Sequence, residues 1–143
     1  MKVYLDTCVW CRPFDKPSRR IKEEAKAFHK ILDLADSGRV RIVTSYLTLL
    51  EASLIEPVQK RESVLALIHK SSEHKIKVKD TLEAVARKVI NECGLDPMDA
   101  AHVAIAVEEG IDIFLTTDDG ILNKSRCLSK YGIIVMNPCD FEV

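Results

Sequence analysis

Short apolar runs alternate along the chain with longer segments in which apolar side chains recur at helical spacing. The apolar runs fall at residues 2–5, 40–44, 76–78, 111–116 and 133–136. Strands that alternate with helices are typical of a parallel sheet, whose two faces the helices cover. The pattern therefore predicts an α/β fold with a mostly parallel central sheet between helices.

Residues with known preferences for helix ends divide the segments between these runs. Ser45 can cap one helix, Pro97 suits the first position of another, and Gly94 marks the end of a third. The predicted helices span residues 20–37, 45–55, 59–72, 80–94, 96–110 and 120–130. No repeat, low-complexity tract or linker interrupts this order, so residues 1–143 are expected to form one domain.

The charge of the chain is balanced, with 22 acidic and 21 basic residues and a formal net charge of −1. Any binding of nucleic acid must therefore come from a local basic patch, or from a metal ion that bridges phosphate to carboxylates. The first apolar run ends at Asp6 and is too short for a signal peptide, and no stretch is long enough to cross a bilayer. We expect a cytoplasmic protein without membrane contact.

Five cysteines are spread over the chain. Their odd number and the lack of a secretion signal argue against a disulfide framework. Cys8 and Cys11 form a C-x-x-C pair, but the residues that follow are typical of a loop, whereas a redox motif needs a helix N-terminus. A zinc site would need two more ligands, which the sequence lacks. The pair is interpreted as free thiols in a loop.

Two aspartates stand where predicted strands end. Asp6 follows the run 2–5, and Asp118 follows the run 111–116. In open α/β sheets, ligands bind at the carboxyl ends of parallel strands, so both carboxylates point to the expected site. A helix cap or a turn would explain each aspartate equally well, because Asp favours both positions.

Two further acids stand on predicted helices. The neighbours of Glu51 three and four positions away are apolar or small, which places its carboxylate on the face toward the sheet. A buried carboxylate needs a cation or donors, unless it reaches a pocket edge or pairs with a basic side chain. Asp99 lies in the first turn after Pro97, where free N–H groups favour the ionised form, although it could also complete the cap. His102, one turn further on, is interpreted as a packed or hydrogen-bonded core histidine outside the chemistry.

Carboxylates that converge repel one another and raise one another's pKa values. A hard divalent cation removes this conflict, and ligation by oxygen alone favours Mg²⁺ or Mn²⁺ over zinc. Such a centre activates water and neutralises charge on a phosphodiester. No P-loop, G-x-G-x-x-G or Ser–His–Asp pattern offers a competing chemistry. The candidate metal ligands and catalytic residues are Asp6, Glu51, Asp99 and Asp118.

The segment after the first predicted strand is basic. It contains Arg12, Lys16, Arg19, Arg20 and Lys22, with Asp15 as the only acid among them. Because the segment begins just after Asp6, part of it should lie near the acidic cluster, and Arg12 and Lys16 are the candidate contacts with nucleic-acid phosphates. Contacts of this kind hold phosphates without reading the base sequence. A solvated loop and helix start would show the same composition.

Several short motifs resemble, in their order and spacing, the PIN-domain family. They are Leu5-Asp6-Thr7, Thr44-Ser45 followed by Leu50-Glu51, Asp99-Ala100-Ala101-His102-Val103-Ala104, Leu115-Thr116-Thr117-Asp118, and the closing Asn137-Pro138-Cys139-Asp140-Phe141. The resemblance spans nearly the whole chain. One departure is Cys8, where the family often has Asn or Ser, so that one polar group near the metal is missing.

The resemblance implies a three-layer α/β/α sandwich and an Mg²⁺- or Mn²⁺-dependent ribonuclease, similar to the VapC-like toxins of toxin–antitoxin pairs. It makes the acidic quartet of Asp6, Glu51, Asp99 and Asp118 the metal centre. Thr116 would hold this centre through hydrogen bonds, and Asp119 would assist as an acid outside the ligand set. The implied partners are RNA, an antitoxin protein and a second copy of the chain in a homodimer.

Two other classes of protein remain open. A PIN-like module could bind RNA or a protein without cutting, although the complete quartet argues against this, because degenerate members usually lose acids. A phosphatase or phosphotransfer domain could use Asp6 as its nucleophile, but the haloacid-dehalogenase-like pattern needs a second Asp at the position of Cys8. Mn²⁺-dependent cleavage of RNA that is lost on substitution of Glu51 would separate the nuclease from both.

Overall fold

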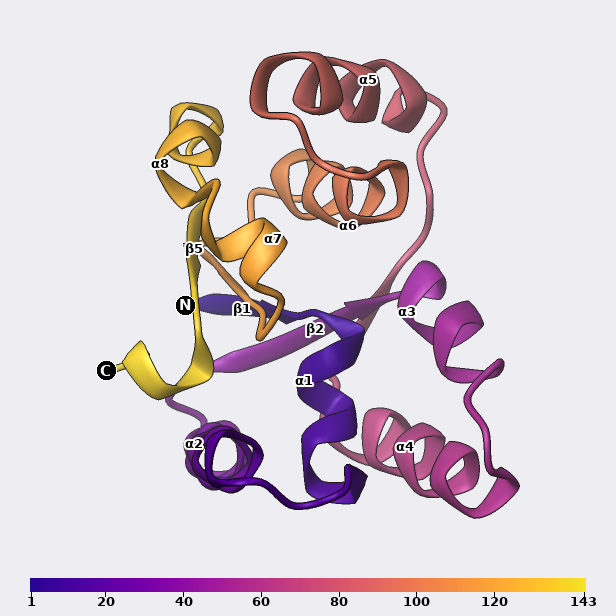
Figure 1. Ribbon diagram of the computed structural model, residues 1–143. Helices are drawn as coiled ribbons and strands as arrows, with labels where there is room; N and C mark the ends of the chain where they lie inside the picture. The colour runs from indigo at the N-terminus through magenta and orange to yellow at the C-terminus, as the bar shows by residue number, and fades with distance from the viewer.

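The computed structural model describes residues 1–143 and is built around one sheet (Figure 1). Its strands are β1 (Lys2–Leu5), β2 (Arg41–Ser45), β3 (His74–Ile76), β4 (Ile113–Leu115) and β5 (Ile134–Met136). They lie in the order β3-β2-β1-β4-β5, and each neighbouring pair is parallel. The predicted parallel α/β sheet is confirmed, and the first strand of the chain lies at its centre.

Helices cover both faces of this sheet (Figure 1). The α-helices are α1 (Thr7–Cys11), α2 (Arg19–Asp36), α3 (Tyr46–Ala52), α4 (Val58–Ser71), α5 (Leu82–Cys93), α6 (Pro97–Glu108), α7 (Asp119–Leu122) and α8 (Ser125–Leu128), and the 3₁₀ turns are η1 (Arg12–Phe14), η2 (Ser129–Tyr131) and η3 (Pro138–Asp140). One face carries α1, α2 and α4, and the other carries α5, α6, α7 and α8. This is the expected three-layer sandwich. None of the helices is both long and apolar enough to span a lipid bilayer.

Alternate residues of the central strand face the two helical layers, because successive side chains of a strand point to opposite faces. Val3 and Leu5 belong to the core on the side of α1, α2 and α4, whereas Tyr4 belongs to the core on the side of α5 and α6. All three side chains are fully buried. Packing on both faces therefore fixes the end of β1, and with it the position of Asp6.

Several predicted helix ends are found where the local sequence places them. The Ser45 hydroxyl accepts a hydrogen bond from Thr48 N–H at 3.2 Å and caps α3. Pro97 is the first residue of α6, and Gly94 ends α5 in the left-handed region with a φ of 72°. The region 120–130, predicted as one helix, is instead divided into α7, α8 and part of η2, because the chain turns at residues 123–124.

The cysteines depart from the expectation in two respects. Cys93 at the end of α5 and Cys127 of α8 form a disulfide, with their Cα atoms 5.8 Å apart. The expectation that the chain has no disulfide is therefore wrong for this pair, because the count of cysteines does not show that α5 and α8 are neighbours. Cys8 and Cys11 are free thiols as expected, but they lie on α1 rather than in a loop, because Asp6 caps a helix there.

Candidate metal centre

Parallel strands bring the candidate acids to one edge of the sheet. Asp6 directly follows β1, Asp118 lies shortly after β4, and Glu51 lies on α3, which directly follows β2. Asp99 lies in the first turn of α6. Since β2, β1 and β4 are parallel neighbours, their carboxyl ends meet at this edge.

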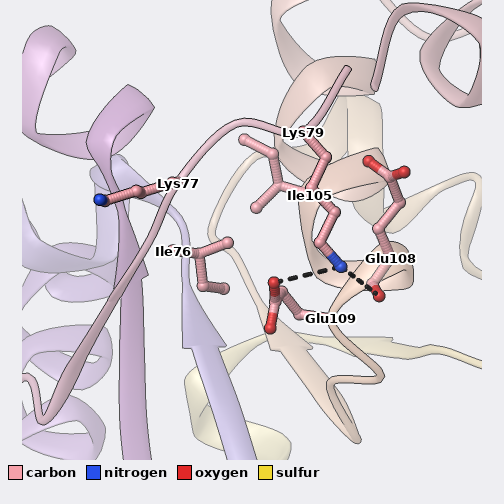
Figure 2. Close-up of a pocket in the computed structure, with 6 residues that line it drawn as sticks. All are labelled: Ile76, Lys77, Lys79, Ile105, Glu108 and Glu109. Atoms are coloured by element: carbon pink, nitrogen blue, oxygen red, sulfur yellow. Dashed lines mark hydrogen bonds and ion pairs between the residues drawn. The ribbon is translucent and has the colours of Figure 1, made fainter. Parts of the chain in front are cut away.

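The cavities of the structure lie away from these acids. One depression lies between the β3–α5 connection and the end of α6, and it is lined by Ile76, Lys77, Lys79, Ile105, Glu108 and Glu109 (Figure 2). It has no room for a molecule the size of water, and its Lys79 ammonium pairs with the Glu109 carboxylate at 3.4 Å. None of the other cavities is lined by any of the four candidate acids. The acids therefore do not line any of these cavities, and their exposure ranges from the buried Asp6 to the exposed Asp118.

Asp6 is held by hydrogen-bond donors on two sides. Only 6% of the residue is exposed. Its Oδ1 accepts a hydrogen bond from Thr7 N–H at 2.9 Å and so caps α1. Its Oδ2 accepts from the Thr116 hydroxyl at 2.9 Å and from the Cys8 thiol at 3.5 Å. Asp6 is a helix cap, as one reading of the sequence allowed, and the same carboxylate also faces the other acids.

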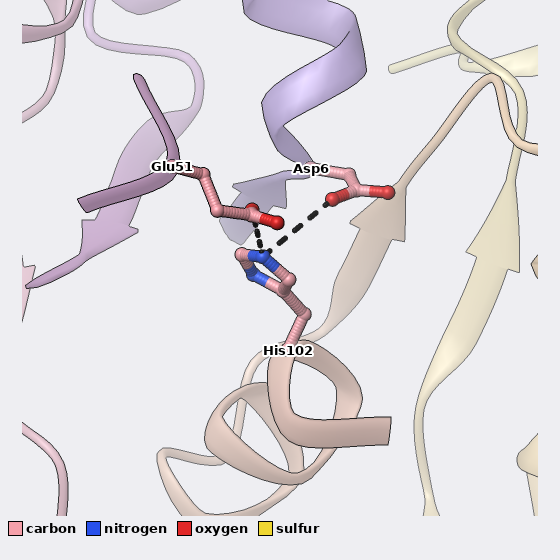
Figure 3. Close-up of side chains that lie close together, drawn as sticks. All are labelled: Asp6, Glu51 and His102. Carbon is pink, nitrogen blue, oxygen red and sulfur yellow. Dashed lines mark hydrogen bonds and ion pairs between the residues drawn. The ribbon is translucent and has the colours of Figure 1, made fainter. Parts of the chain in front are cut away.

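Glu51 reaches from α3 toward Asp6 and His102 (Figure 3). Its Oε1 accepts a hydrogen bond from the Thr7 hydroxyl at 2.6 Å and lies 2.5 Å from Nε2 of His102. Burial acts to raise the pKa of Glu51, but the hydrogen bonds from His102 and Thr7 outweigh burial and hold the pKa below its ordinary value. The carboxylate is thus stabilised in its charged form by neutral donors and by the imidazole.

His102 is the residue of this cluster that sequence analysis placed outside the chemistry. It is 1% exposed, its Nε2 lies 4.0 Å from Asp6 Oδ1, and its Nδ1 lies 2.6 Å from the Tyr4 hydroxyl. Potential ligand atoms of Asp6, Glu51 and His102 all lie within 4.8 Å of one another (Figure 3). The available signal was its position one helical turn after Asp99, but nothing in the sequence showed that Glu51 would face it.

Asp99 and Asp118 form a second, looser part of the site. Asp99 is half-buried, and no side-chain hydrogen bond caps the start of α6. Burial, the charge of Asp118 and the charge of Asp6, in this order, raise the pKa of Asp99 to about 6. Asp118 is exposed, and its Oδ1 accepts from Gly120 N–H at 2.8 Å, which caps α7. Both acids lie outside the close cluster of Figure 3 but within electrostatic reach of it.

Thr116 and Asp119, the predicted supporting residues, have different environments. Thr116 is fully buried, and its hydroxyl donates to Asp6 and accepts from Asp118 N–H at 3.1 Å. It therefore joins the ends of β1 and β4. The Asp119 carboxylate is exposed and pairs with the Arg20 guanidinium at 2.9 Å, which lowers the pKa of Asp119. Arg20 also donates to the Thr117 carbonyl at 2.8 Å, so Asp119 anchors α2 to the loop after β4.

The two predicted RNA contacts also differ. The Arg12 guanidinium pairs with Asp15 at 2.7 Å and with the buried Glu24 at 2.8 Å. Lys16 is exposed. Glu24, which sequence analysis did not single out, also accepts from Arg20 at 3.2 Å. Arg12 thus has two protein partners, whereas Lys16 lies open to solvent.

The side chains at this edge fit a hard divalent cation. Asp6 and Glu51 offer carboxylate oxygens within 4.8 Å of one another, and Asp99 and Asp118 add negative charge nearby. Burial first, and then the charges of Asp118 and Asp6, raise the pKa of Asp99, and a cation would relieve the repulsion between these charges. Oxygen donors without a thiolate are typical of Mg²⁺ or Mn²⁺ sites, and the Cys8 thiol is occupied as a donor to Asp6.

Three solved structures share this fold at low sequence identity. VapBC2 from Rickettsia felis, bound to a DNA fragment from its promoter, has 15% identity and a TM-score of 0.65, over 96% of this chain and 98% of that one. VapC20 from Mycobacterium tuberculosis, a Sarcin-Ricin loop cleaving toxin, has 19% identity and a TM-score of 0.60, over 85% and 94%. VapBC-5 from the same organism has 16% identity and a TM-score of 0.58, over 95% and 98%.

Comparison with curated proteins found no matching relative. The family model described as PIN domain matches residues 3–126, a span that starts in β1 and ends in α8. This span contains all four candidate acids, His102 and Thr116. Because the match covers most of the sheet and the whole acidic edge, the chain belongs to the PIN-domain family.

Proposed function

We propose that the protein is an endoribonuclease that depends on Mg²⁺ or Mn²⁺. The observation that carries the proposal is the convergence of Asp6 and Glu51 at the carboxyl edge of a parallel sheet, with Asp99 and Asp118 close by, in a chain of the PIN-domain family. The alternative of a PIN-like module without catalysis would not require this set of acids to be complete.

The four acids would hold the metal ion, which supplies an activated water and neutralises charge on the phosphodiester. Asp6 is held in position by Thr7 and Thr116, and Glu51 by Thr7 and His102. These hydrogen bonds set the direction of two carboxylates before any substrate arrives. Such preorganisation removes a cost that would otherwise fall on the transition state.

The lack of a concave pocket around the acids supports a polymer as the substrate. Small-molecule sites are usually concave and bury most of their ligand. No cavity here is lined by the four acids, so a chain such as single-stranded or structured RNA can lie along the edge. The structural neighbour VapC20 is described as a toxin that cleaves the Sarcin-Ricin loop, which supports RNA as the class of substrate.

An antitoxin protein is the proposed partner, and the chain would be the toxin of the pair. Two of the structural neighbours are VapBC assemblies of toxin–antitoxin systems. The helix that carries Glu51 and the turn that follows it have large apolar side chains open to solvent, namely Tyr46 and Leu50 on the helix and Leu54 in the turn. Exposed apolar side chains that gather on one element are typical of an interaction surface. A homodimer stays a prediction, and sedimentation of the purified chain would test it.

The direct test is cleavage of single-stranded RNA by the purified protein. We expect activity with Mg²⁺ or Mn²⁺ and none in EDTA, because the carboxylates alone cannot activate water. Restoring Mn²⁺ after EDTA should restore cleavage and exclude irreversible damage. Full activity in EDTA would contradict the metal-dependent mechanism, and RNA binding without cleavage under all metal conditions would favour the non-catalytic module.

A second test concerns the basic segment after β1. Lys16→Ala should weaken RNA binding at every sequence and reduce the salt slope by about 1, because one phosphate contact is lost. Lys70→Ala is the matched control, since Lys70 is exposed near the end of α4 and just before β3, at the opposite edge of the sheet. Arg12→Ala should mainly lower stability, because it leaves the buried Glu24 without one partner. Equal binding by the Lys16 variant and the parent at all salt concentrations would exclude Lys16 from the RNA path.

A further inference from the structure

We propose that the buried pair Tyr4 and His102 positions Glu51 through a fixed imidazole tautomer, and that His102 is not itself a metal ligand. The inference deepens the proposed function and rests on it, since Glu51 matters here as a ligand of the metal. His102 lies close enough to Asp6 and Glu51 to be read as a third ligand. Which of the two roles it has depends on where the ring carries its proton.

The contact between His102 and Glu51 places a proton on Nε2. Glu51 Oε1 lies 2.5 Å from Nε2, and a carboxylate oxygen offers only lone pairs. Two lone pairs cannot face each other at that distance, so Nε2 must donate and Oε1 must accept. The same oxygen also accepts from the Thr7 hydroxyl at 2.6 Å, so two donors hold it from two directions.

The contact between His102 and Tyr4 accounts for the other ring nitrogen. In the neutral imidazole that the proposal assigns, the proton on Nε2 leaves Nδ1 as an acceptor, and the Tyr4 hydroxyl lies 2.6 Å from it. The phenol therefore donates its single proton to Nδ1. Its oxygen can then accept from Ser45 Oγ at 2.7 Å and from Thr48 Oγ1 at 3.1 Å. The proton of each hydroxyl has a partner in this arrangement.

The hydrogen bonds of Tyr4 and His102 are buried, so the fold itself holds them in place. Tyr4, Ser45 and Thr48 are fully buried and His102 is 1% exposed, so water does not compete for their hydrogen bonds. Tyr4 belongs to the central strand, and its ring stacks on Phe114 of the neighbouring strand, with centroids 5.3 Å apart and planes at 12°. The phenol that selects the tautomer is therefore fixed by the sheet itself. Hydrogen bonds behind a ligand orient it in this way at many metal sites.

The tautomer decides what each group offers to a cation. A protonated Nε2 has no lone pair to give, so the metal would be held by carboxylate oxygens alone. The hydrogen bonds from Thr7 and His102 both go to Glu51 Oε1, and Oε2 accepts none from either. Loss of a group that orients a ligand typically weakens metal affinity by about 10- to 100-fold. Tyr4 is one group further from the ligand, so its loss should fall at the lower end of this range.

The first experiment measures Mn²⁺ affinity by titration calorimetry on metal-free protein, without RNA. Tyr4→Phe should bind Mn²⁺ about 10-fold more weakly, because Nδ1 loses the donor that fixes the tautomer. The matched control is Tyr131→Phe, which removes a hydroxyl that donates to Glu92, a residue outside the candidate ligand set. His102→Gln, whose amide can still donate near the position of Nε2, should retain more affinity than His102→Leu. Melting temperatures of all variants report whether they fold.

The second experiment reads the tautomer directly by ¹⁵N NMR of the imidazole in the parent protein. We expect His102 to carry its proton on Nε2 and none on Nδ1, both without metal and with Mg²⁺. Loss of the Nε2 proton on addition of Mg²⁺ would make His102 a ligand and overturn the inference. Unchanged Mn²⁺ affinity in a folded Tyr4→Phe variant would also overturn it. Failure of the parent protein to bind Mn²⁺ at all would instead overturn the proposed function.

Discussion

The acidic edge has two halves, one around Glu51 and one around Asp99, and they are built in opposite ways. Around Glu51, the Thr7 hydroxyl and the His102 imidazole supply donors, and the pKa of the carboxyl is lowered although it is half-buried. Around Asp99, burial and the charges of Asp118 and Asp6 raise the pKa to about 6. One half is thus organised by hydrogen bonds within the protein, whereas the other carries charge that the protein leaves unbalanced.

The difference follows from where the two acids lie in the fold. Glu51 projects from α3 toward α6 and the start of α1, and each of these two elements supplies it with a donor. Asp99 lies at the exposed start of α6, where burial and the charges of Asp118 and Asp6 outweigh the opposing effect of His102 on its pKa. The hydrogen bonds around Glu51 therefore fix the geometry of the site, whereas the unbalanced charge around Asp99 attracts a cation. Each part of this conclusion can be tested by substitution.

The largest effect is expected on catalysis, where both halves should be indispensable. Glu51→Gln and Asp99→Asn should each reduce RNA cleavage with Mn²⁺ by about 1,000-fold, which corresponds to ~4 kcal/mol of transition-state stabilisation. The comparison variant is Asp33→Asn, which changes an exposed acid on α2. Initial rates under single-turnover conditions measure the loss. A variant of either acid that keeps a tenth or more of the parent rate would remove that half from the catalytic site.

The second effect is on the stability of the metal-free protein. Substitution of Asp99 and substitution of Glu51 should change the free energy of unfolding in opposite directions. The folded-state pKa of Asp99, about 6, lies above its ordinary value of 3.8, so the folded chain binds this proton more tightly than the unfolded chain. Stability from this group is present below pH ~4 and is lost as pH rises through about 6. Asp99→Asn should therefore raise the free energy of unfolding at pH 7 by about 1 kcal/mol after allowance for solvent screening.

The gain from Asp99→Asn should shrink to nothing at about pH 3, below both pKa values, where the parent carboxyl is largely protonated in both states. For Glu51 the folded pKa is lowered, so its contribution is present above the unfolded pKa and is lost as pH falls through the folded one. Glu51→Gln should thus lower stability at neutral pH. Urea unfolding of the parent, Asp99→Asn and Glu51→Gln proteins in EDTA, from acidic to neutral pH, measures both trends. Equal changes in the free energy of unfolding of the two variants would contradict the distinction between the halves.

The smallest effect is expected from the groups behind the acids. Thr7→Val removes a donor to Glu51 and should lower the free energy of unfolding by about 1 kcal/mol. Asp118→Asn should leave it unchanged or slightly higher, because Asn also caps helices and one charge near Asp99 is removed. Thermal melts in EDTA compare the two. A stabilised Thr7 variant, or a strongly destabilised Asp118 variant, would show that the donors and charges have been assigned to the wrong halves.

The framework of the fold follows from local patterns along the chain. The alternation of apolar runs and helical segments predicted the parallel sheet, because the period of the apolar side chains is a local property of the chain. Because ligands bind at the carboxyl ends of parallel strands, the positions of Asp6 and Asp118 predicted a site at one edge of the sheet. The apolar neighbours of Glu51 predicted that its side chain faces the sheet. Membership of the PIN-domain family agrees with this order. The assignment of the four acids as metal ligands, and of residues 1–143 as one domain, stays a prediction.

Contacts between side chains within that framework depend on how distant elements pack. Tyr4 and His102 are 98 residues apart, and the contact that joins them arises because β1 and α6 pack together. The Cys93–Cys127 disulfide and the pairing of Arg20 with Asp119 depend in the same way on neighbours that no local pattern reveals. Periodicity fixes the direction of a side chain relative to its own helix or strand. What it faces is set by packing between elements distant in sequence, and this is why the partner of Glu51 could not be predicted.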